Sequence, residues 1–308
     1  MLTHLIILLD DSSVSYCHYE VVPTKHRQMP LGILKRGIAW AMKENLNIQF
    51  VYPDYQLPDK YRETIETIDH TKIGSANCGE NLDVTILKDL DEKLKSDGCY
   101  LWRSKLDNLL RKTSQVKTIL SNVARLNLVL TDILSWKQSE FDCYKALLED
   151  LAGHLANLYK QGRYVQLNLL TDRLILNRMN NCNAGDANVT LAPDGRFYVC
   201  PAFYPQNSIG SLDEGLHTPN KQLYRLDHAP ICRQCEAYQC RRCVWMNQRA
   251  TLDCNTPSHE QCVAAHLERN SSRLLLQKLT DIGIKLEGVQ EIKEIDYLDP
   301  FNIVNKWK

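Results

Sequence analysis

Cysteines are the residues of this sequence whose spacing most plainly indicates chemistry. Eight of the chain's twelve cysteines lie between Cys182 and Cys262, and four of them form two Cys-x-x-Cys pairs separated by four residues. One such pair can hold a metal centre from a single tight turn, because it presents two thiolates to the same point. We therefore predict a metal site. Its candidate ligands are Cys182, Cys200, Cys232, Cys235, Cys240, Cys243, Cys254 and Cys262.

A disulfide framework is the competing explanation for these cysteines. Such frameworks are typical of short secreted chains with a signal peptide, whereas this chain has 308 residues. The apolar run Leu5–Leu9 is too short for a membrane span and lacks the basic flank and cleavage site of a signal peptide. We expect a cytoplasmic protein, because in that reducing compartment clustered thiols bind metals or do redox work.

The charges of the chain are balanced, with 37 Lys and Arg residues against 37 Asp and Glu residues. Such a chain has no overall field that would draw it to nucleic acid or to an anionic membrane, and we expect neither as a partner. Its length leaves room for one large domain or two ordinary ones with a sizeable apolar core.

Strand and helix patterns alternate through the first 180 residues. The unbroken apolar run Leu5–Leu9 is typical of a parallel strand covered on both faces. Apolar residues then recur at helical spacing from Leu31 to Met42, before a second strand at Ile48–Val51. Further strands are predicted at 83–87, 125–130 and 164–169, with a weaker one near 72–73, and further helices at 58–68, 102–112 and 141–158. This alternation predicts an α/β layer or an incomplete barrel with a mainly parallel sheet.

The pattern changes at about residue 180, where a run rich in Asn and Gly indicates a loop. We place a domain boundary there. The first domain, residues 1–180, is the α/β domain, and the second, residues 181–308, is a cysteine-rich metal-binding domain with a C-terminal helix and a charged tail.

A hairpin is predicted early in the second domain. Its strands, 189–191 and 197–199, flank a turn with Pro193 at its second position and Gly195 where a positive φ is needed. The hairpin would bring Cys182 and Cys200 together at its open end.

A capping box predicts that a helix begins after Ser258, with Gln261 reaching back to it, and runs to about Leu276. Cys262 would lie in the first turn, where the positive helix terminus favours a thiolate.

Other residues near the cysteines have possible roles. Arg241 and Arg242 would offset the charge of a metal–thiolate cluster, or lie in solvent. His228, His259 and His266 could complete a zinc set, although the thiolates make them optional.

Four cysteines lie outside the dense run. Cys78, Cys99 and Cys143 are typical of small buried hydrophobes. Cys17 follows the first strand in a polar loop, where α/β folds place ligand and catalytic groups, or the loop merely connects two elements. No catalytic residue is identified by these patterns.

The order of the cysteines resembles the SPASM domain, which holds two auxiliary [4Fe-4S] clusters in radical SAM peptide-modifying enzymes. It reads Cys182-x12-Gly195-x4-Cys200, then Cys232-x2-Cys235-x4-Cys240-x2-Cys243, and finally Cys262. Two of these spacings are shorter than the usual ones of the family.

Segments 5–19, 166–173, 181–185 and 229–232 also resemble proteins named CXXX repeat peptide maturases, and this likeness covers most of the sequence. It implies action on a ribosomally made precursor peptide with repeated Cys-x-x-x units, alongside a separate radical SAM enzyme. The fold it implies is a degenerate radical SAM-like α/β barrel or layer, followed by the SPASM-like domain.

The triad Cys-x3-Cys-x2-Cys, which a radical SAM enzyme needs to bind S-adenosylmethionine at an open iron, does not occur in this sequence. The resemblance therefore implies a maturase component without a cluster of its own that cleaves S-adenosylmethionine. Whether that component is catalytic stays open.

The resemblance also implies two ligand sets. One cluster would be held by Cys232, Cys235, Cys240 and Cys262. The other would be held by Cys182, Cys200 and Cys243, with either an open iron or Cys254 as the fourth ligand.

Zinc is the alternative metal, because sites with four thiolates use the same Cys-x-x-Cys pairs. Eight cysteines would suit two closed zinc sites. The protein would then be a zinc-stabilised peptide- or partner-binding module without catalysis.

Overall fold

The computed structural model describes residues 1–20, 27–92 and 94–301, and it divides the chain into two compact units. Unit 1 comprises Met1–Leu87 and Asn183–His228, and unit 2 comprises Lys88–Cys182 and Ala229–Lys308. Each unit thus combines segments that are far apart in the sequence. The predicted boundary at about residue 180, between an α/β domain and a cysteine-rich metal-binding domain, stays a prediction.

Unit 1 is built around the predicted first strand, β1 (His4–Leu8), which is parallel to β2 (Asn47–Val51) on one side and to β8 (Asn188–Leu191) on the other. Leu5 pairs with both Ile48 and Val189 and is fully buried, as the apolar run predicts. The strand order is β4-β3-β2-β1-β8-β9. The remaining strands are β3 (Thr71–Gly74) and β4 (Val84–Leu87), which are parallel, and β9 (Phe197–Tyr198), which is antiparallel to β8.

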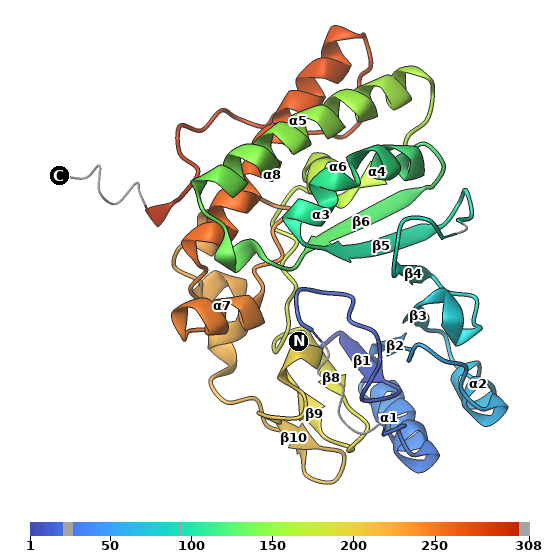
Figure 1. Cartoon of the computed structure of the whole chain (residues 1–308). Coiled ribbons are helices and arrows are strands. Elements are labelled where there is room, and N and C mark those ends of the chain that lie inside the picture. Colours follow the sequence, from blue (N-terminus) through green and yellow to red (C-terminus); the bar gives the residue numbers. More distant parts are fainter. Residues whose placement is uncertain (21–26, 93, 302–308) are drawn as a thin grey trace. The chain divides into compact units, whose positions relative to one another are not determined.

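The first helix of unit 1, α1 (Leu31–Lys43), lies on this sheet (Figure 1). Its residues Leu34, Ile38 and Ala41 are buried because they recur at helical spacing on one face. A short second helix, α2 (Asp59–Ile65), lies within the predicted range 58–68.

The hairpin of β8 and β9 confirms the predicted turn. Gly195 has a φ of 79°, and the backbone N–H of Ala192 donates to the carbonyl of Arg196 over 3.1 Å. A smaller antiparallel hairpin follows, formed by β10 (Gly210–Ser211) and β11 (Gly215–Leu216).

In the described part of unit 2, parallel strands lie in the order β7-β6-β5. The strands are β5 (Cys99–Ser104), β6 (Arg125–Leu130) and β7 (Gln166–Leu167). Its helices are α3 (Leu106–Arg111), α4 (Thr113–Leu120), α5 (Gln138–Lys160), α6 (Asn168–Ile175), α7 (Val244–Thr251) and α8 (His259–Asp281). Short 3-10 turns of the two units lie at Ala76–Cys78, Ile133–Ser135, Pro201–Phe203, Lys221–Tyr224, Leu226–His228 and Cys232–Gln234.

Two predicted elements of unit 2 were partly wrong. The helix predicted at 102–112 begins only at Leu106, because Tyr100, Leu101 and Trp102 are buried in a strand that pairs with β6. The strand predicted at 164–169 ends at Leu167.

The side chain of Asn168 explains that early end. Its amide oxygen accepts from the backbone N–H of Leu128 over 2.8 Å, and its amide nitrogen donates to the Leu128 carbonyl over 2.9 Å. The Asn168 side chain therefore replaces the backbone hydrogen bonds by which β7 would continue along β6, and α6 begins at Asn168.

The long helices α5 and α8 pack along each other in unit 2 (Figure 1). The helix predicted after Ser258 is confirmed and extends to Asp281, and the Ser258 hydroxyl accepts from the backbone N–H of Gln261 over 3.3 Å. The return contact of the capping box was wrong, because the Gln261 side chain donates instead to the Asn247 amide oxygen over 3.0 Å.

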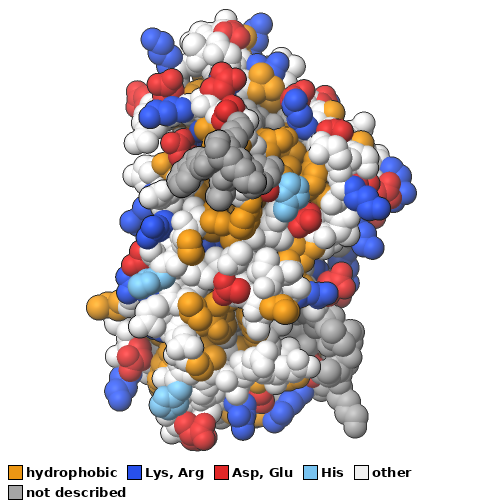
Figure 2. Space-filling model, turned by 90° about the vertical axis from the view of Figure 1, so that its left-hand side faces the viewer, with side chains coloured by type: hydrophobic (Ala, Val, Ile, Leu, Met, Phe, Trp, Pro, Cys, Tyr) orange, Lys and Arg blue, Asp and Glu red, His pale blue; other side chains and the backbone are white. Residues whose placement is uncertain are grey.

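Among the described helices, none has both the length and the apolar character needed to cross a membrane. On the face drawn in Figure 2, basic and acidic side chains are intermixed, in agreement with the balanced composition.

Two glycines of α1 provide a test of the packing in unit 1. A Cβ at Gly37 would lie 2.3 Å from Leu191 Cδ2, whereas a Cβ at Gly32 would meet nothing within 4 Å. Leu191 is fully buried, so Gly37→Ala should lower the free energy of unfolding by about 1–3 kcal/mol. The matched change Gly32→Ala should be neutral or raise it by up to ~1 kcal/mol. Chemical denaturation measures both, and equal effects would contradict this packing.

Candidate metal centre

The segment Cys232–Cys243 of unit 2 forms two cysteine turns that hold sulfur atoms by backbone hydrogen bonds. The N–H of Ala237 donates to Cys235 Sγ, and the N–H of Arg242 donates to Cys240 Sγ, each over 3.4 Å. In both turns the donor is two residues after the cysteine. Donors at these positions stabilise a thiolate, which is the form of cysteine that binds metal.

Helix α8 anchors this segment. The Gln239 side chain donates to the Ala265 carbonyl over 2.6 Å, and Arg269 Nη2 donates to the Glu236 carboxylate over 2.8 Å. His266 Nε2 lies 3.8 Å from Cys235 Sγ. These contacts place the two cysteine turns against the first half of α8, which carries Cys262.

The thiols of Cys232, Cys235, Cys240 and Cys262 interact electrostatically with one another. Burial is the main cause that raises the pKa of Cys262, and negative charge at Cys240, Cys232 and Cys235 raises it further. Burial likewise raises the pKa of Cys232 to about 12, with the charge of Arg242 acting against it. Four cysteines from two segments therefore share one low-dielectric site.

Burial decides the protonation of these thiols in the protein without metal. The helix terminus was expected to favour the thiolate of Cys262, but desolvation outweighs it and the pKa is raised. Such thiols ionise when a metal cation supplies the compensating charge, so their affinity for metal is coupled to proton release.

The donor chemistry of this site fits either an iron–sulfur cluster or zinc, because both accept four cysteine thiolates. Within the described parts of the chain, no three His, Cys, Asp or Glu side chains are arranged so that they could hold a metal ion. The described side chains therefore do not form a coordination shell in this structure.

Three other candidate ligands also belong to unit 2. The backbone N–H of Cys182 donates to the Arg241 carbonyl over 2.9 Å, and Cys243 directly precedes α7. The Cys254 carbonyl accepts from the Asn247 side chain in α7 over 2.9 Å. The backbone at Cys182 therefore lies beside the cysteine turns, and both Cys243 and Cys254 are tied to α7.

The fourth candidate, Cys200, belongs to unit 1, where it follows β9 and precedes a 3-10 turn. Its predicted approach to Cys182 stays a prediction. The same holds for a centre that would use both cysteines.

Cysteines outside the site differ in their surroundings. Cys78 is buried, as expected, and Cys99 is half-buried and accepts from the Asn127 side chain over 3.5 Å. The expectation of a buried Cys143 was wrong, because it lies on the exposed face of α5.

The three histidines near the cysteines have separate environments. His266 is buried beside Cys235, and burial lowers its pKa. His259 Nδ1 lies 2.6 Å from the buried Asp299 carboxylate, and His228 is exposed in unit 1.

Sequence reasoning missed a carboxyl group near the cysteine turns. Glu268, on α8, accepts from the Tyr144 hydroxyl over 2.7 Å and from Gln239 over 3.4 Å. Its side chain keeps partial solvent access, but the surrounding protein desolvates it and raises its pKa to about 7. The position of Glu268, six residues after Cys262, was only a weak sequence signal that it lies near the cysteines. Its contact with Tyr144 depends on the packing of α5 on α8, which the sequence does not show.

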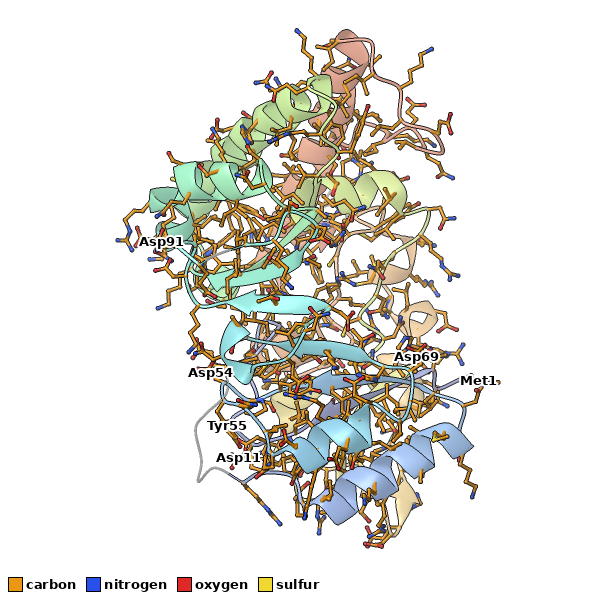
Figure 3. The ribbon with its side chains drawn as sticks, turned by 90° about the vertical axis from the view of Figure 1, so that its right-hand side faces the viewer. Met1, Asp11, Asp54, Tyr55, Asp69 and Asp91 are labelled. Atoms are coloured by element: carbon orange, nitrogen blue, oxygen red, sulfur yellow. The ribbon has the colours of Figure 1, made fainter. Side chains whose placement is uncertain are left out.

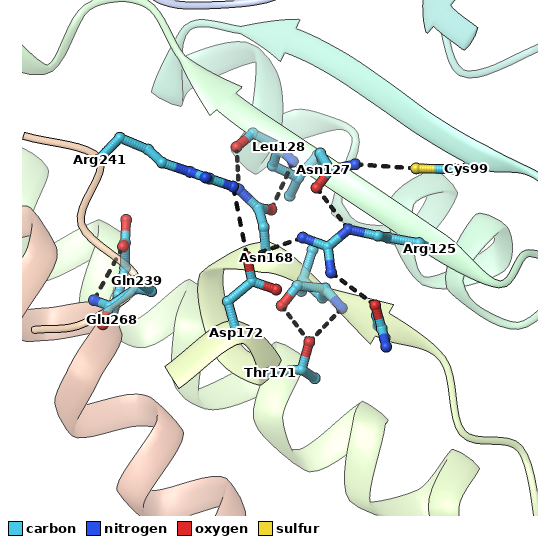
Figure 4. A network of polar contacts seen from close by, with 12 residues as sticks. Cys99, Arg125, Asn127, Leu128, Asn168, Thr171, Asp172, Gln239, Arg241 and Glu268 are labelled. Carbon is cyan, nitrogen blue, oxygen red and sulfur yellow. Dashed lines mark hydrogen bonds and ion pairs between the residues drawn. The ribbon is translucent and has the colours of Figure 1, made fainter. Parts of the chain in front are cut away.

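A polar network extends from this region toward β6 (Figure 4). Asp172 on α6 is buried and accepts from Arg125 over 2.9 Å, and Arg241 lies 3.9 Å from the same carboxylate oxygen. Arg241, half-exposed, is therefore directed to Asp172. Its neighbour Arg242 is 1 % exposed.

In unit 1 the polar segment after β1 folds back on itself. Asp10 accepts from the backbone N–H of Ser12 over 2.7 Å and from the Tyr55 hydroxyl over 2.6 Å. Burial alone would raise the pKa of Asp10, but hydrogen bonds from Ser12 and Tyr55 hold it below its usual value. Cys17 lies in this segment and is half-buried.

Polar residues also follow the neighbouring strand of unit 1. Asp11, Asp54 and Tyr55 lie at one end of these strands, and Met1 and Asp69 lie at the other (Figure 3). The Ser75 hydroxyl, directly after β3, donates to Asp54. This is the carboxyl end of the parallel strands, where α/β folds bind their ligands.

Comparison with known proteins shows the fold. No protein-family model matches the sequence, and no curated protein matches it. The structure of histidine-tagged anSMEcpe with bound AdoMet has 12% sequence identity and a TM-score of 0.61, over 92% of this chain and 96% of that one. Native anSMEcpe with bound AdoMet and the Cp18Cys peptide has 13% identity and a TM-score of 0.57, over 91% and 100%.

A weaker likeness, with a TM-score of 0.44 and 11% identity, is to SuiB of Streptococcus suis bound to its precursor peptide SuiA, over 72% of this chain and 64% of that one. The likeness to anSMEcpe establishes a mixed α/β fold with a mostly parallel sheet, and to that extent it agrees with the alternation of strands and helices predicted from the sequence.

The raised pKa of Glu268 generates a prediction about stability. In the folded protein Glu268 stays protonated up to about pH 7, whereas in the unfolded chain it ionises near pH 4.3. Between these two pH values, folding is coupled to the uptake of a proton. The free energy of unfolding of the wild type, relative to that of Glu268→Gln, should therefore fall by roughly 1–3 kcal/mol as the pH rises from about 4.5 to 7, and it should stay level above pH 7.

Denaturation of both proteins between pH 5 and pH 8 measures this difference. The control is Glu149→Gln, because Glu149 is exposed on α5, the helix that carries Tyr144. The same stability difference for Glu268→Gln at pH 5 and pH 8 would show that this carboxyl group is not desolvated.

Proposed function

We propose that this chain is an iron–sulfur protein of the reducing cytoplasm that acts in the maturation of a ribosomally made peptide with Cys-x-x-x repeats. One observation carries the proposal. The two cysteine turns that contain Cys232, Cys235 and Cys240 dock on the first half of α8, which carries Cys262, and these are the four cysteines that the resemblance to the SPASM domain selects.

The fold supports a role in peptide modification. The structures of anSMEcpe have bound AdoMet, and one also holds the Cp18Cys peptide. The sequence itself resembles the peptide maturases associated with radical SAM enzymes, so we assign a cysteine-rich precursor peptide as the substrate or cargo.

The proposed cofactors are two [4Fe-4S] clusters in a SPASM-like domain, which would supply electron transfer when bound. Cys232, Cys235, Cys240 and Cys262 would hold the first. Within this set, the N–H groups of Ala237 and Arg242 stabilise the sulfurs, and α8 fixes the loop through Gln239.

The second cluster would be held by Cys182, Cys200 and Cys243, with Cys254 or an open position as the fourth. The link between Cys254 and α7 favours Cys254 as that ligand, because α7 begins directly after Cys243.

The partner is a separate radical SAM enzyme. The sequence has no Cys-x3-Cys-x2-Cys triad, so the chain would present the peptide or transfer electrons, and the partner would cleave S-adenosylmethionine.

The first test concerns the ligands. Cys262→Ser should remove one metal centre, because a lost thiolate leaves that centre one ligand short. The control is Cys143→Ser, since Cys143 is exposed on α5. Metal per chain and the visible spectrum should change only in Cys262→Ser, and full metal retention in that variant would overturn the assignment.

Cys254→Ser separates the two arrangements of the second centre. If Cys254 is a ligand, this change should deplete a different centre from the one that Cys262→Ser removes. A metal content equal to that of the wild type would assign the open position instead. Iron analysis of the double variant, which should lose both centres in the first case, completes the comparison.

The second test concerns activity. The purified protein with a reductant should form no 5′-deoxyadenosine from S-adenosylmethionine, and modification of a Cys-x-x-x repeat peptide should require both this protein and the partner enzyme. Mass spectrometry of the peptide detects modification, with a peptide of Ser-x-x-x repeats as the control. 5′-Deoxyadenosine formed by the protein alone would refute the proposed division of labour.

A further inference from the structure

Residues 292–301 of unit 2, which we call the strap, return along α8 after that helix has ended (Figure 1). Between residues 282 and 300 the chain forms no helix or strand. The polar contacts of the strap show its direction. Arg269 Nη2 donates to the Lys293 carbonyl over 2.8 Å, whereas His259 Nδ1, at the start of α8, lies 2.6 Å from Asp299 Oδ2. The strap therefore runs antiparallel to α8.

The middle of the strap lies next to a cysteine turn. The ring of Tyr297 packs on the ring of His266, with the two centroids 5.4 Å apart. His266 is 2 % exposed, and its Nδ1 lies 2.8 Å from the Cys262 carbonyl oxygen. Because a carbonyl only accepts, Nδ1 carries the proton, and Nε2, 3.8 Å from Cys235 Sγ, can accept from that thiol. Through Tyr297, the strap thus packs on the imidazole that contacts the Cys235 sulfur.

Asp299 is the most firmly held side chain of the strap. It is 4 % exposed, and its two carboxylate oxygens have separate partners. Oδ1 accepts from the backbone N–H of Phe301 over 2.9 Å, and Oδ2 is the atom beside His259. The ring of His259 in turn lies edge-on to Phe141 of α5, with centroids 6.2 Å apart. Hydrogen bonds to a charged group gain strength where water is excluded, so Asp299 and His259 form a latch at this end of the strap.

The other contacts of the strap are weaker. Glu294 pairs with Arg273 over 3.0 Å, but their side chains are 79 % and 42 % exposed, and exposed pairs add little stability. Ile292 is buried and anchors the strap where it begins. A segment with few apolar anchors and no regular secondary structure can open locally while the domain around it stays folded.

We propose that the strap is a lid on the cysteine turns, that Asp299 and His259 latch it, and that its opening about Ile292 exposes Cys235 and His266 to solvent. In the closed state the strap slows every reaction of the Cys235 sulfur, the binding of metal included. This inference goes beyond the proposed function, because the lid acts on the thiol whether or not a metal is bound.

The experiment measures the alkylation of single cysteines by iodoacetamide in the full chain, purified without oxygen, with tandem mass spectrometry of its peptides. Asp299→Ala removes the latch. It should raise the alkylation rate of Cys235 by about 10-fold or more, because loss of a hydrogen bond to a charged group changes an opening equilibrium by about that factor. Tyr297→Ala should raise this rate too, since it removes the ring that packs on His266.

Matched variants and reference thiols separate opening of the lid from unfolding. Glu294→Gln loses only an exposed ion pair, and Tyr297→Phe keeps the ring, so both should match the wild type. Exposed Cys143 reports the reactivity of an open thiol, and Cys99, in β5, reports unfolding of unit 2. Neither reference rate should change. Where bound metal blocks alkylation, the rate of metal release to a chelator should rank the same variants in the same order.

A rise at Cys235 without a rise at Cys99 supports the lid. An unchanged Cys235 rate in both Asp299→Ala and Tyr297→Ala would overturn it. An equal rise at Cys99 would also overturn it, because the strap would then be part of the core of unit 2. If Asp299→Ala does not fold, the comparison of Tyr297→Ala with Tyr297→Phe decides. The metal content of the wild type tests the proposed function separately.

Discussion

The docking of the Cys232–Cys243 segment on α8 is the interaction on which the site depends. Gln239, Glu236 and His266 make the contacts that join the two, and they bring a thiol of the helix next to thiols of the loop. The loop contributes few apolar side chains of its own. Polar contacts and backbone N–H groups hold its sulfurs, which is the arrangement expected where a metal completes the folding of a segment.

Local patterns predicted most of the fold because each depends on residues close in sequence. The apolar run of β1, the helical period of α1 and α5, the turn at Gly195 and the cap at Ser258 are of this kind. The errors arose where a distant partner decides the structure. Asn168 ends β7 through the backbone of Leu128, and Gln261 turns from its cap to Asn247.

The candidate site shows the same division. Cysteine spacing identified the candidate ligands, because a Cys-x-x-Cys turn is encoded locally. The charged groups around these cysteines come from residues that are distant in the sequence or differ in burial, so the cysteine spacing did not predict them. The desolvated Glu268 depends on the packing of α5 on α8, and the difference between Arg241 and Arg242 depends on the burial of one side chain and the exposure of its neighbour. Charge placement around the thiols therefore had to come from the structure.

The central claim is that the grouped thiols bind iron–sulfur clusters. The most direct measurement is the amount of iron, acid-labile sulfide and zinc per chain in wild-type protein purified without oxygen, together with its Mössbauer spectrum. Two clusters predict about eight iron and eight sulfide per chain, with the spectrum of [4Fe-4S] centres. A folded protein with two zinc ions and no sulfide, or with no metal, would contradict the account.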